Sequence, residues 1–337
     1  MKFFKKAFLI LIFLFPISNS FGAMITHNQT VSVDPGTLIA GVAFNSDGTK
    51  VFTSSANSPD NQFINEFSLS IPYDVSSKTY TGDSERCDMG GRMESTPYDL
   101  EFSSDGMRFF IVTRNPGENA ADGDKAYGFD LTSPYDVSTC TFASQTTDLD
   151  SPTFTSGSLA GDFDHAGTDN RKHKLQGIEI NNDGTKLFLI WFDGADADVG
   201  ARLLEYTLST PYDLTTLSLV TSAGISFATP AASSIYVNNP ASMRFSPNGK
   251  RVFITSHDET NAGVTQVSFT NYFDSSSFVI DGTLNVNNLT PSNNEPRGLA
   301  FGVNGIKLII ANDFNQNSAD QLMEYDLVCP FNLFEGK

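Results

Sequence analysis

The hydrophobic and polar positions of this 337-residue chain follow one pattern that recurs five times. Each copy alternates apolar and polar residues, passes a polar turn and enters a second apolar run, as in GVAFNSDGTKVF from Gly41. The other copies are DLEFSSDGMRFF from Asp99, GIEINNDGTKLF from Gly177, SMRFSPNGKRVF from Ser242 and GLAFGVNGIKLI from Gly298. Successive copies begin 58, 78, 65 and 56 residues apart, a spacing that indicates a propeller or array.

Each copy predicts a four-stranded antiparallel unit. Alternation with a period of two predicts strand A, and the Asp-Gly or Asn-Gly turn predicts a tight hairpin into strand B. A polar loop leads to strand C, and a second recurring turn, such as PYD in FSLSIPYDVSS from Phe67, leads to strand D. Five such units predict an all-β protein, a β-propeller with five four-stranded blades and few exposed sheet edges.

The two ends of the chain complement each other in this arrangement. The fifth unit ends after strand C and its turn, so its strand D is missing. An additional strand, Ile25 to Val33, precedes the first unit. We therefore predict that Ile25 to Val33 pairs with the strand around Met323 to Leu327 and closes the ring.

The N-terminus predicts export. Residues 1–22 combine three lysines, the apolar run Ala7 to Phe15 and the small polar residues Ser18 to Ser20, a pattern typical of a secretory signal peptide. The apolar run is shorter than the roughly 20 residues that span a bilayer. We expect residues 23–337 to form a single propeller domain in the periplasm or outside the cell, with no membrane span.

Charge narrows the range of partners. The full chain has a net charge of −18, and removal of the three leader lysines makes it more acidic still. Such a surface repels phosphate backbones, so nucleic acid is not an expected partner. The three cysteines, Cys87, Cys140 and Cys329, leave at least one thiol unpaired, and the sequence leaves the pairing open.

The turns that join strands A and B resemble those of a known group of proteins. Ser246-Pro-Asn-Gly-Lys250 and Asn45-Ser-Asp-Gly-Thr-Lys50 are similar to the Ser-Pro-Asp-Gly-Lys-type turns of secreted bacterial β-propellers of the Tol-Pal and lactonase-like kinds. The resemblance covers nearly the whole mature chain and implies the fold. It leaves function open, because such propellers hydrolyse, scaffold or bind.

One long connection predicts a candidate metal site. The segment DFDHAGTDN from Asp162 resembles the calcium loops of EF-hands, with Asp162, Asp164 and Asn170 at ligand positions. Ala166 stands where a third carboxylate belongs, and His173 stands where an EF-hand has its bidentate glutamate. This spacing suggests Ca²⁺ as a cofactor, but the interpretation that we favour is a solvated acidic loop without metal.

Ligand binding is expected on one face of the propeller. The A–B and C–D turns share one face and are short, whereas the connections on the other face are long, which favours recognition there. We assign ligand binding to Trp191, His173 and Arg297. Trp191 replaces small polar residues of the other blades, so it could stack on a sugar or, as we favour, fill a gap in the core.

The inner strands carry charged residues at equivalent positions. The residues that alternate with the apolar positions of strand A are Ala43, Glu101, Glu179, Arg244 and Ala300. Glu179 and Arg244 belong to neighbouring blades, so we predict a partly buried ion pair between them.

No nucleophile elbow or phosphate-binding glycine loop is present in the sequence. We therefore expect a monomeric, exported, non-catalytic propeller that binds a protein or glycan ligand through its long-loop face. The alternatives are a propeller hydrolase of the lactonase or glycosidase kind and a passenger segment of a larger surface protein. A clustered, partly buried group of carboxylates or histidines at the channel mouth would favour the enzyme, and a broad exposed apolar or aromatic patch would favour the binding protein.

Overall fold

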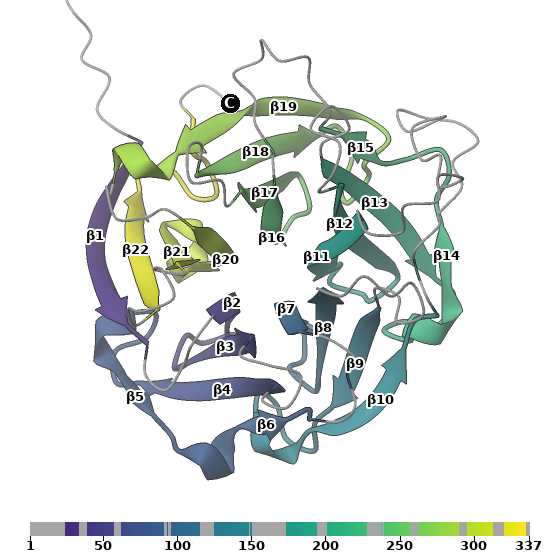
Figure 1. The fold of residues 1–337 in the computed structure, drawn as a ribbon. Coiled ribbons are helices and arrows are strands. Elements are labelled where there is room, and N and C mark those ends of the chain that lie inside the picture. Colours follow the sequence, from purple (N-terminus) through teal and green to yellow (C-terminus); the bar gives the residue numbers. More distant parts are fainter. Residues whose placement is uncertain are drawn as a thin grey trace, which may run out of the picture.

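Five antiparallel sheets stand around a common axis (Figure 1). The structure is a computed structural model, and it describes residues 24–33, 39–56, 62–90, 93, 96–114, 125–147, 149, 173–193, 201–227, 237, 239–256, 262–289, 295–312 and 320–334. Each sheet has a four-stranded path from the axis to the rim. The fold is therefore the five-bladed β-propeller that the repeat pattern predicts.

The strands of each blade follow one another outwards from the axis. Blade 1 contains β2 (Ile39–Phe44), β3 (Lys50–Ala56), β4 (Gln62–Leu69) and β5 (Lys78–Tyr80), and β6 (Cys87–Asp88) also pairs with β4. Blade 2 contains β7 (Thr96–Phe102), β8 (Arg108–Arg114), β9 (Ala126–Asp130) and β10 (Thr141–Gln145). Blade 3 contains β11 (His173–Ile180), β12 (Lys186–Asp193), β13 (Ala201–Leu208) and β14 (Leu217–Leu219), and β15 (Ile225–Ser226) also pairs with β13.

Blade 4 contains β16 (Pro240–Phe245), β17 (Arg251–Ser256), β18 (Gly263–Phe269) and β19 (Phe278–Asn285). Blade 5 contains β20 (Pro296–Gly302), β21 (Lys307–Asn312), β22 (Gln321–Leu327) and β1 (Ile25–Ser32). The helical segments among the described residues are single 3₁₀ turns: η1 (Val75–Ser77), η2 (Asp83–Glu85), η3 (Val137–Thr139), η4 (Leu214–Thr216), η5 (Val286–Asn288) and η6 (Val303–Gly305).

The N-terminal strand closes the ring, as predicted. β1 lies antiparallel to β22, with Ile25 opposite Leu327 and Ser32 opposite Gln321. The backbone NH of Val33 also donates to the carbonyl of Asp320 at 2.7 Å. The outer edge of blade 5 is therefore covered by the other end of the chain, which protects β22 from pairing with a second molecule.

The two recurring turns of each repeat contact each other. In blade 1, Gly48 of the A–B turn has a φ of +72°, and a Cβ placed on it would lie 2.3 Å from the ring of Tyr73 in the C–D turn. The NH of Tyr73 donates to the carbonyl of Gly48 at 2.8 Å. Tyr73 itself has a φ of +60°, a conformation that aromatic residues rarely adopt. Equivalent glycine–aromatic pairs occur in the other blades: Gly106 with Tyr135, Gly184 with Tyr212, Gly249 with Phe273 and Gly305 with Phe331. In each blade, the C–D turn therefore supplies the aromatic residue that packs on the glycine of the A–B turn.

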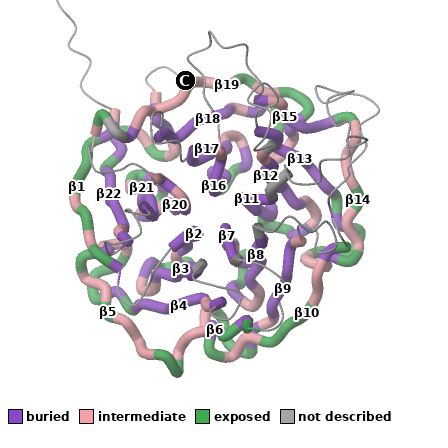
Figure 2. The backbone as a smooth tube through the Cα atoms, in the orientation of Figure 1, coloured by how far each residue is buried: buried purple, intermediate pink, exposed green. Residues whose placement is uncertain are grey.

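Aromatic rings hold neighbouring blades together. Phe52 packs on Phe102 across blades 1 and 2, with ring centroids 4.8 Å apart. Phe188 and Phe245 repeat this contact between blades 3 and 4 at 4.6 Å. The inner strands are largely buried, whereas the outer strands are intermediate to exposed (Figure 2). The core therefore lies between blades, and the alternating pattern of strand A directs apolar side chains into it.

Two features bear on the compartment of the protein. Cys87 of β6 forms a disulfide with Cys140 beside β10, which links blades 1 and 2, and Cys329 is a free cysteine. No helix among the described residues is long and apolar enough to cross a membrane. The expected signal peptide, residues 1–22, lies outside the described residues.

Candidate active site at the channel mouth

The inner strands approach one another so closely that small residues are required at the axis. A Cβ on Gly298 would lie 2.7 Å from the backbone of Ala40 and Val42, and one on Gly41 would lie 2.8 Å from the carbonyl of Tyr98. The equivalent residues of the repeat are Gly41, Asp99, Gly177, Ser242 and Gly298. Asp99 and Ser242 are the two departures from glycine, and their polar side chains meet at the axis.

Asp99 is fully buried and joins three blades. Its carboxylate accepts hydrogen bonds from the backbone NH groups of Ile178 at 3.2 Å and Met243 at 3.3 Å, and from the Ser242 hydroxyl at 2.9 Å. Both terminal nitrogens of Arg244 donate to it at 3.1 Å. Burial raises the pKa of Asp99 and Arg244 opposes this rise. Because these partners are all donors, the geometry supports the ionised carboxylate.

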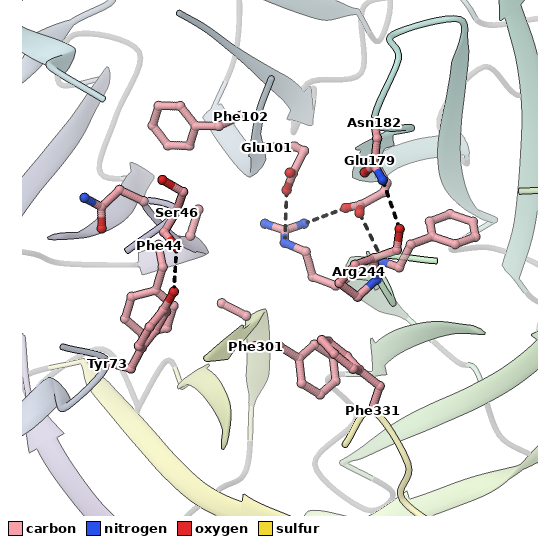
Figure 3. A pocket seen from close by; sticks show the side chains of 15 residues that line it. Phe44, Ser46, Tyr73, Glu101, Phe102, Glu179, Asn182, Arg244, Phe301 and Phe331 are labelled. Carbon is pink, nitrogen blue, oxygen red and sulfur yellow. Dashed lines mark hydrogen bonds and ion pairs between the residues drawn. The ribbon is translucent and has the colours of Figure 1, made fainter. Parts of the chain in front are cut away.

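Arg244 crosses from blade 4 to the opposite side of the axis. Its guanidinium donates to the carbonyl of Val42 in blade 1 at 3.1 Å and to that of Leu100 in blade 2. It also contacts Glu101 at 3.3 Å and Glu179 at 3.6 Å. The predicted ion pair between Glu179 and Arg244 is therefore confirmed (Figure 3). It is part of a larger cluster that also contains Asp99 and Glu101.

Glu101 and Glu179 point towards the same guanidinium from neighbouring blades (Figure 3). Burial raises the pKa of Glu101 to about 7, with Arg244 opposing the rise and Asp99 adding to it. The pKa of Glu179 is raised well above its ordinary value, first by burial and then by the negative charge of Glu101. One cation thus faces three carboxyl groups, an arrangement that favours a proton on Glu179 and partial ionisation of Glu101 near neutral pH.

A pocket of about 280 Å³ opens above this cluster. Its floor contains Glu101, Glu179 and Arg244 (Figure 3). Its other lining residues come from the inner strands and the short turns: Ala43, Phe44, Asn45, Ser46, Tyr73, Phe102, Asn182, Phe245, Pro247, Ala300, Phe301 and Phe331. The carboxyl pair is therefore accessible from the face that carries the A–B and C–D turns.

Aromatic side chains form the walls of the pocket, and contacts with neighbouring residues hold them in place. Phe44 packs edge-on against Tyr73 at 5.2 Å, and Phe301 packs against Phe331 at 5.0 Å. The Tyr73 hydroxyl donates to the carbonyl of Ser46 at 2.8 Å. Apolar walls with a few convergent polar groups are typical of small-molecule sites. Rings of this kind also suit the apolar faces of sugars.

The residues assigned from sequence lie elsewhere. Trp191 is 1% exposed and packs in the core of blades 2 and 3, so its position agrees with the gap-filling role. Arg297 lies near the other end of the channel, where it contacts Glu295 at 3.0 Å and stacks over Tyr98. His173 begins β11, opposite Asp193 of β12.

The calcium prediction is a separate matter. Asp162, Asp164 and Asn170 lie outside the described residues. In the part of the chain that the structure does describe, no group of three or more metal-ligating side chains could hold an ion. The calcium site stays a prediction.

Sequence reasoning found three of the four residues of the cluster. Glu101, Glu179 and Arg244 were identified as channel-wall residues, but Asp99 was missed. The sequence does contain an indication that Asp99 is special, because it occupies a position that holds glycine in three of the other four repeats. A charged residue at a glycine position next to the axis must find partners on neighbouring blades.

The comparisons with known proteins concern the fold. No protein-family model and no curated protein sequence matches this chain. It is similar to a periplasmic gluconolactonase from Pseudomonas aeruginosa, with 13% identity, a TM-score of 0.45 and 81% of this chain covered. A putative 6-phosphogluconolactonase from Bacteroides uniformis shows 14% identity and a TM-score of 0.39, with 80% of this chain covered. The chain spans only 64% and 63% of these two structures.

A third similar structure is the soluble aldose sugar dehydrogenase of Escherichia coli, with 12% identity, a TM-score of 0.46, and 89% of this chain and 99% of that one covered. These similarities concern the propeller fold alone. At such identities they say nothing about the substrate of this chain.

The expectation of a non-catalytic propeller that binds through its long-loop face is wrong. The channel mouth holds the buried carboxylate cluster that we named as the mark of an enzyme, and the pocket opens on the short-turn face. We therefore retain the hydrolase alternative.

Proposed function

We propose that the protein is a propeller hydrolase that cleaves a carbon–oxygen bond in a small sugar-like molecule, either a lactone or a glycoside. The observation that carries this proposal is the pair of unequal carboxyl groups, Glu101 and Glu179, on the floor of an aromatic pocket. Hydrolysis of either bond needs a base to activate water and an acid to protonate the leaving oxygen. Two carboxyl groups with different pKa values fit these roles.

The roles follow from the environment of each group. Glu101 is 22% exposed and partly ionised near neutral pH, so it accepts a proton from water as the water oxygen bonds to the substrate carbon. Glu179 is 9% exposed and protonated, so it donates its proton to the leaving oxygen as the carbon–oxygen bond breaks. The proton on Glu101 then returns to Glu179 through solvent, and the site is ready for another cycle.

Arg244 positions the two carboxyl groups. Its contacts with Asp99 and with two backbone carbonyls hold the guanidinium in place before any substrate binds. A cation fixed in this way also stabilises negative charge that develops on the substrate, without reorganising during the reaction.

A substrate screen tests the proposal. The protein is assayed against a panel of aldonolactones and nitrophenyl glycosides, followed by Glu101→Gln and Glu179→Gln on any substrate that turns over. Each substitution is expected to lower kcat by at least ~100-fold, the usual contribution of a general acid or base. Glu295→Gln, at the other end of the channel, is the matched control and should keep its activity. Lack of turnover on the whole panel, or full activity in both pocket variants, would overturn the proposal.

We also propose that residues 1–22 are a signal peptide and that residues 23–337 act as one monomeric domain in the periplasm or outside the cell. The disulfide between Cys87 and Cys140 supports an oxidising compartment, where such bonds persist. N-terminal sequencing of the protein recovered from fractionated cells checks this. An intact Met1 in the cytoplasmic fraction would contradict it.

A further inference from the structure

A second pocket lies directly beside the axial one. It has a volume of about 520 Å³ and lies over the turns of blades 4 and 5. Pro247 and Phe331 line both pockets, so they mark the common edge. We call this second space the blade-4 pocket. A ligand seated over Glu101 and Glu179 can therefore extend past Phe331 into it.

The blade-4 pocket carries positive charge in an otherwise acidic protein. Lys250 and Arg251 line it, and its described lining includes no Asp or Glu. The hydroxyl of one lining residue, Ser268, donates to the carboxylate of Asp281 at 2.6 Å. Because the chain as a whole has a net charge of −18, this pocket is a local exception that would attract an anion.

Lys250 is a departure from the repeat. The equivalent residues of the other blades are uncharged: Thr49, Met107, Thr185 and Ile306. Its ammonium donates to the carbonyl of Thr270 and lies 4.2 Å from the ring centre of Tyr272. An ammonium has three N–H donors, so Lys250 can still donate to a ligand while keeping the bond to Thr270.

Arg251 holds the edge between the two pockets. Its guanidinium donates to the carbonyl of Phe331 at 2.9 Å, which joins blade 4 to the last turn of blade 5. This hydrogen bond fixes Arg251 of the blade-4 pocket relative to Phe331 of the axial pocket.

We propose that the blade-4 pocket binds an anionic group, a carboxylate or a phosphate, at the far end of the substrate that the axial pocket cleaves. The substrate class is then an acidic sugar derivative. This inference rests on the proposed function for its position relative to the reacting bond, but anion binding by Lys250 can be measured without catalysis.

Calorimetric titration with glucose, glucuronate and glucose 6-phosphate tests the binding step in the full chain. We expect both anions to bind at least ~10-fold more tightly than glucose, because a charge-assisted contact is about twice as strong as a neutral one. Lys250→Gln should remove this preference, and Lys78→Gln on β5 of blade 1 should keep it. The two anions also distinguish a carboxylate from a phosphate as the preferred group.

The outcomes separate this inference from the proposed function. If the protein hydrolyses nothing but binds the anions through Lys250, the proposed function fails and the anion site stands. If it hydrolyses neutral substrates as well as their anionic counterparts, and Lys250→Gln leaves the ratio of kcat/KM unchanged, the anion site is refuted while the hydrolase stands. Equal binding of glucose and both anions also refutes the anion site.

Discussion

Replacement of Arg244 by leucine should destabilise the whole propeller. The guanidinium is 8% exposed, bonds to the fully buried Asp99 and also contacts Glu101 and Glu179. Its removal leaves the carboxylate of Asp99 buried without a cation, and breaking a buried pair in this way costs about 3–5 kcal/mol. Two backbone carbonyls, of Val42 and Leu100, lose their donor as well. The loss of stability should therefore lie at the upper end of that range.

Thermal and urea unfolding of Arg244→Leu measure this effect. For a chain of this size each kcal/mol lowers the melting temperature by roughly 2 °C, so a loss near 5 kcal/mol predicts a decrease of about 10 °C. The penalty should be larger at pH 8 than at pH 5, because protonation of the carboxyl groups relieves the uncompensated charge. Arg86→Leu, which loses an ion pair with the exposed Asp83, is the control and should cost much less. A loss below ~1 kcal/mol that does not vary with pH would refute the reasoning.

Three further predictions concern the pocket, the turns and the chain closure. Since burial raises the pKa of Glu101 from 4.5 to about 7, the folded state holds a proton that the unfolded state loses in this window, so stability should fall as the pH rises from 4.5 to 7. Glu101→Gln should reduce that slope by up to about 1.4 kcal/mol per pH unit in urea unfolding, and an unchanged slope would contradict the assignment. Gly48→Ala should destabilise by more than ~1 kcal/mol, because it combines a positive φ with a clash against Tyr73, and a neutral result would show that the turn can relax. Deletion of residues 25–33 should uncover the edge of β22 and cause aggregation in light scattering, whereas a monomeric deletion variant would show that the closure is dispensable.

The strands and their order were determined by local features of the sequence. Alternation of apolar residues and the Asn-Gly or Asp-Gly turns act over only a few residues, so each repeat specifies its own hairpins. The fifth unit lacks its outer strand, and the strand Ile25–Ser32 belongs to no other unit, so we predicted that this strand completes the ring. The pairing of β1 with β22 confirms this prediction. The Glu179–Arg244 pair could be predicted for the same reason, since equivalent positions on adjacent blades become neighbours.

Only the tertiary structure showed which charged residues cluster at the axis and which face carries the pocket. Asp99 contacts Arg244 across 145 positions of sequence, and Arg244 reaches Val42 across 202, so no local pattern reports these contacts. Loop length favoured the opposite face, but the pocket depends on how the five inner strands converge and on the aromatic residues that the short turns project over them. The disulfide between Cys87 and Cys140 likewise depends on how blades 1 and 2 sit side by side. Repeats determine the blades because their signals are local, whereas the site arises where unlike residues at equivalent positions of different blades meet around one axis.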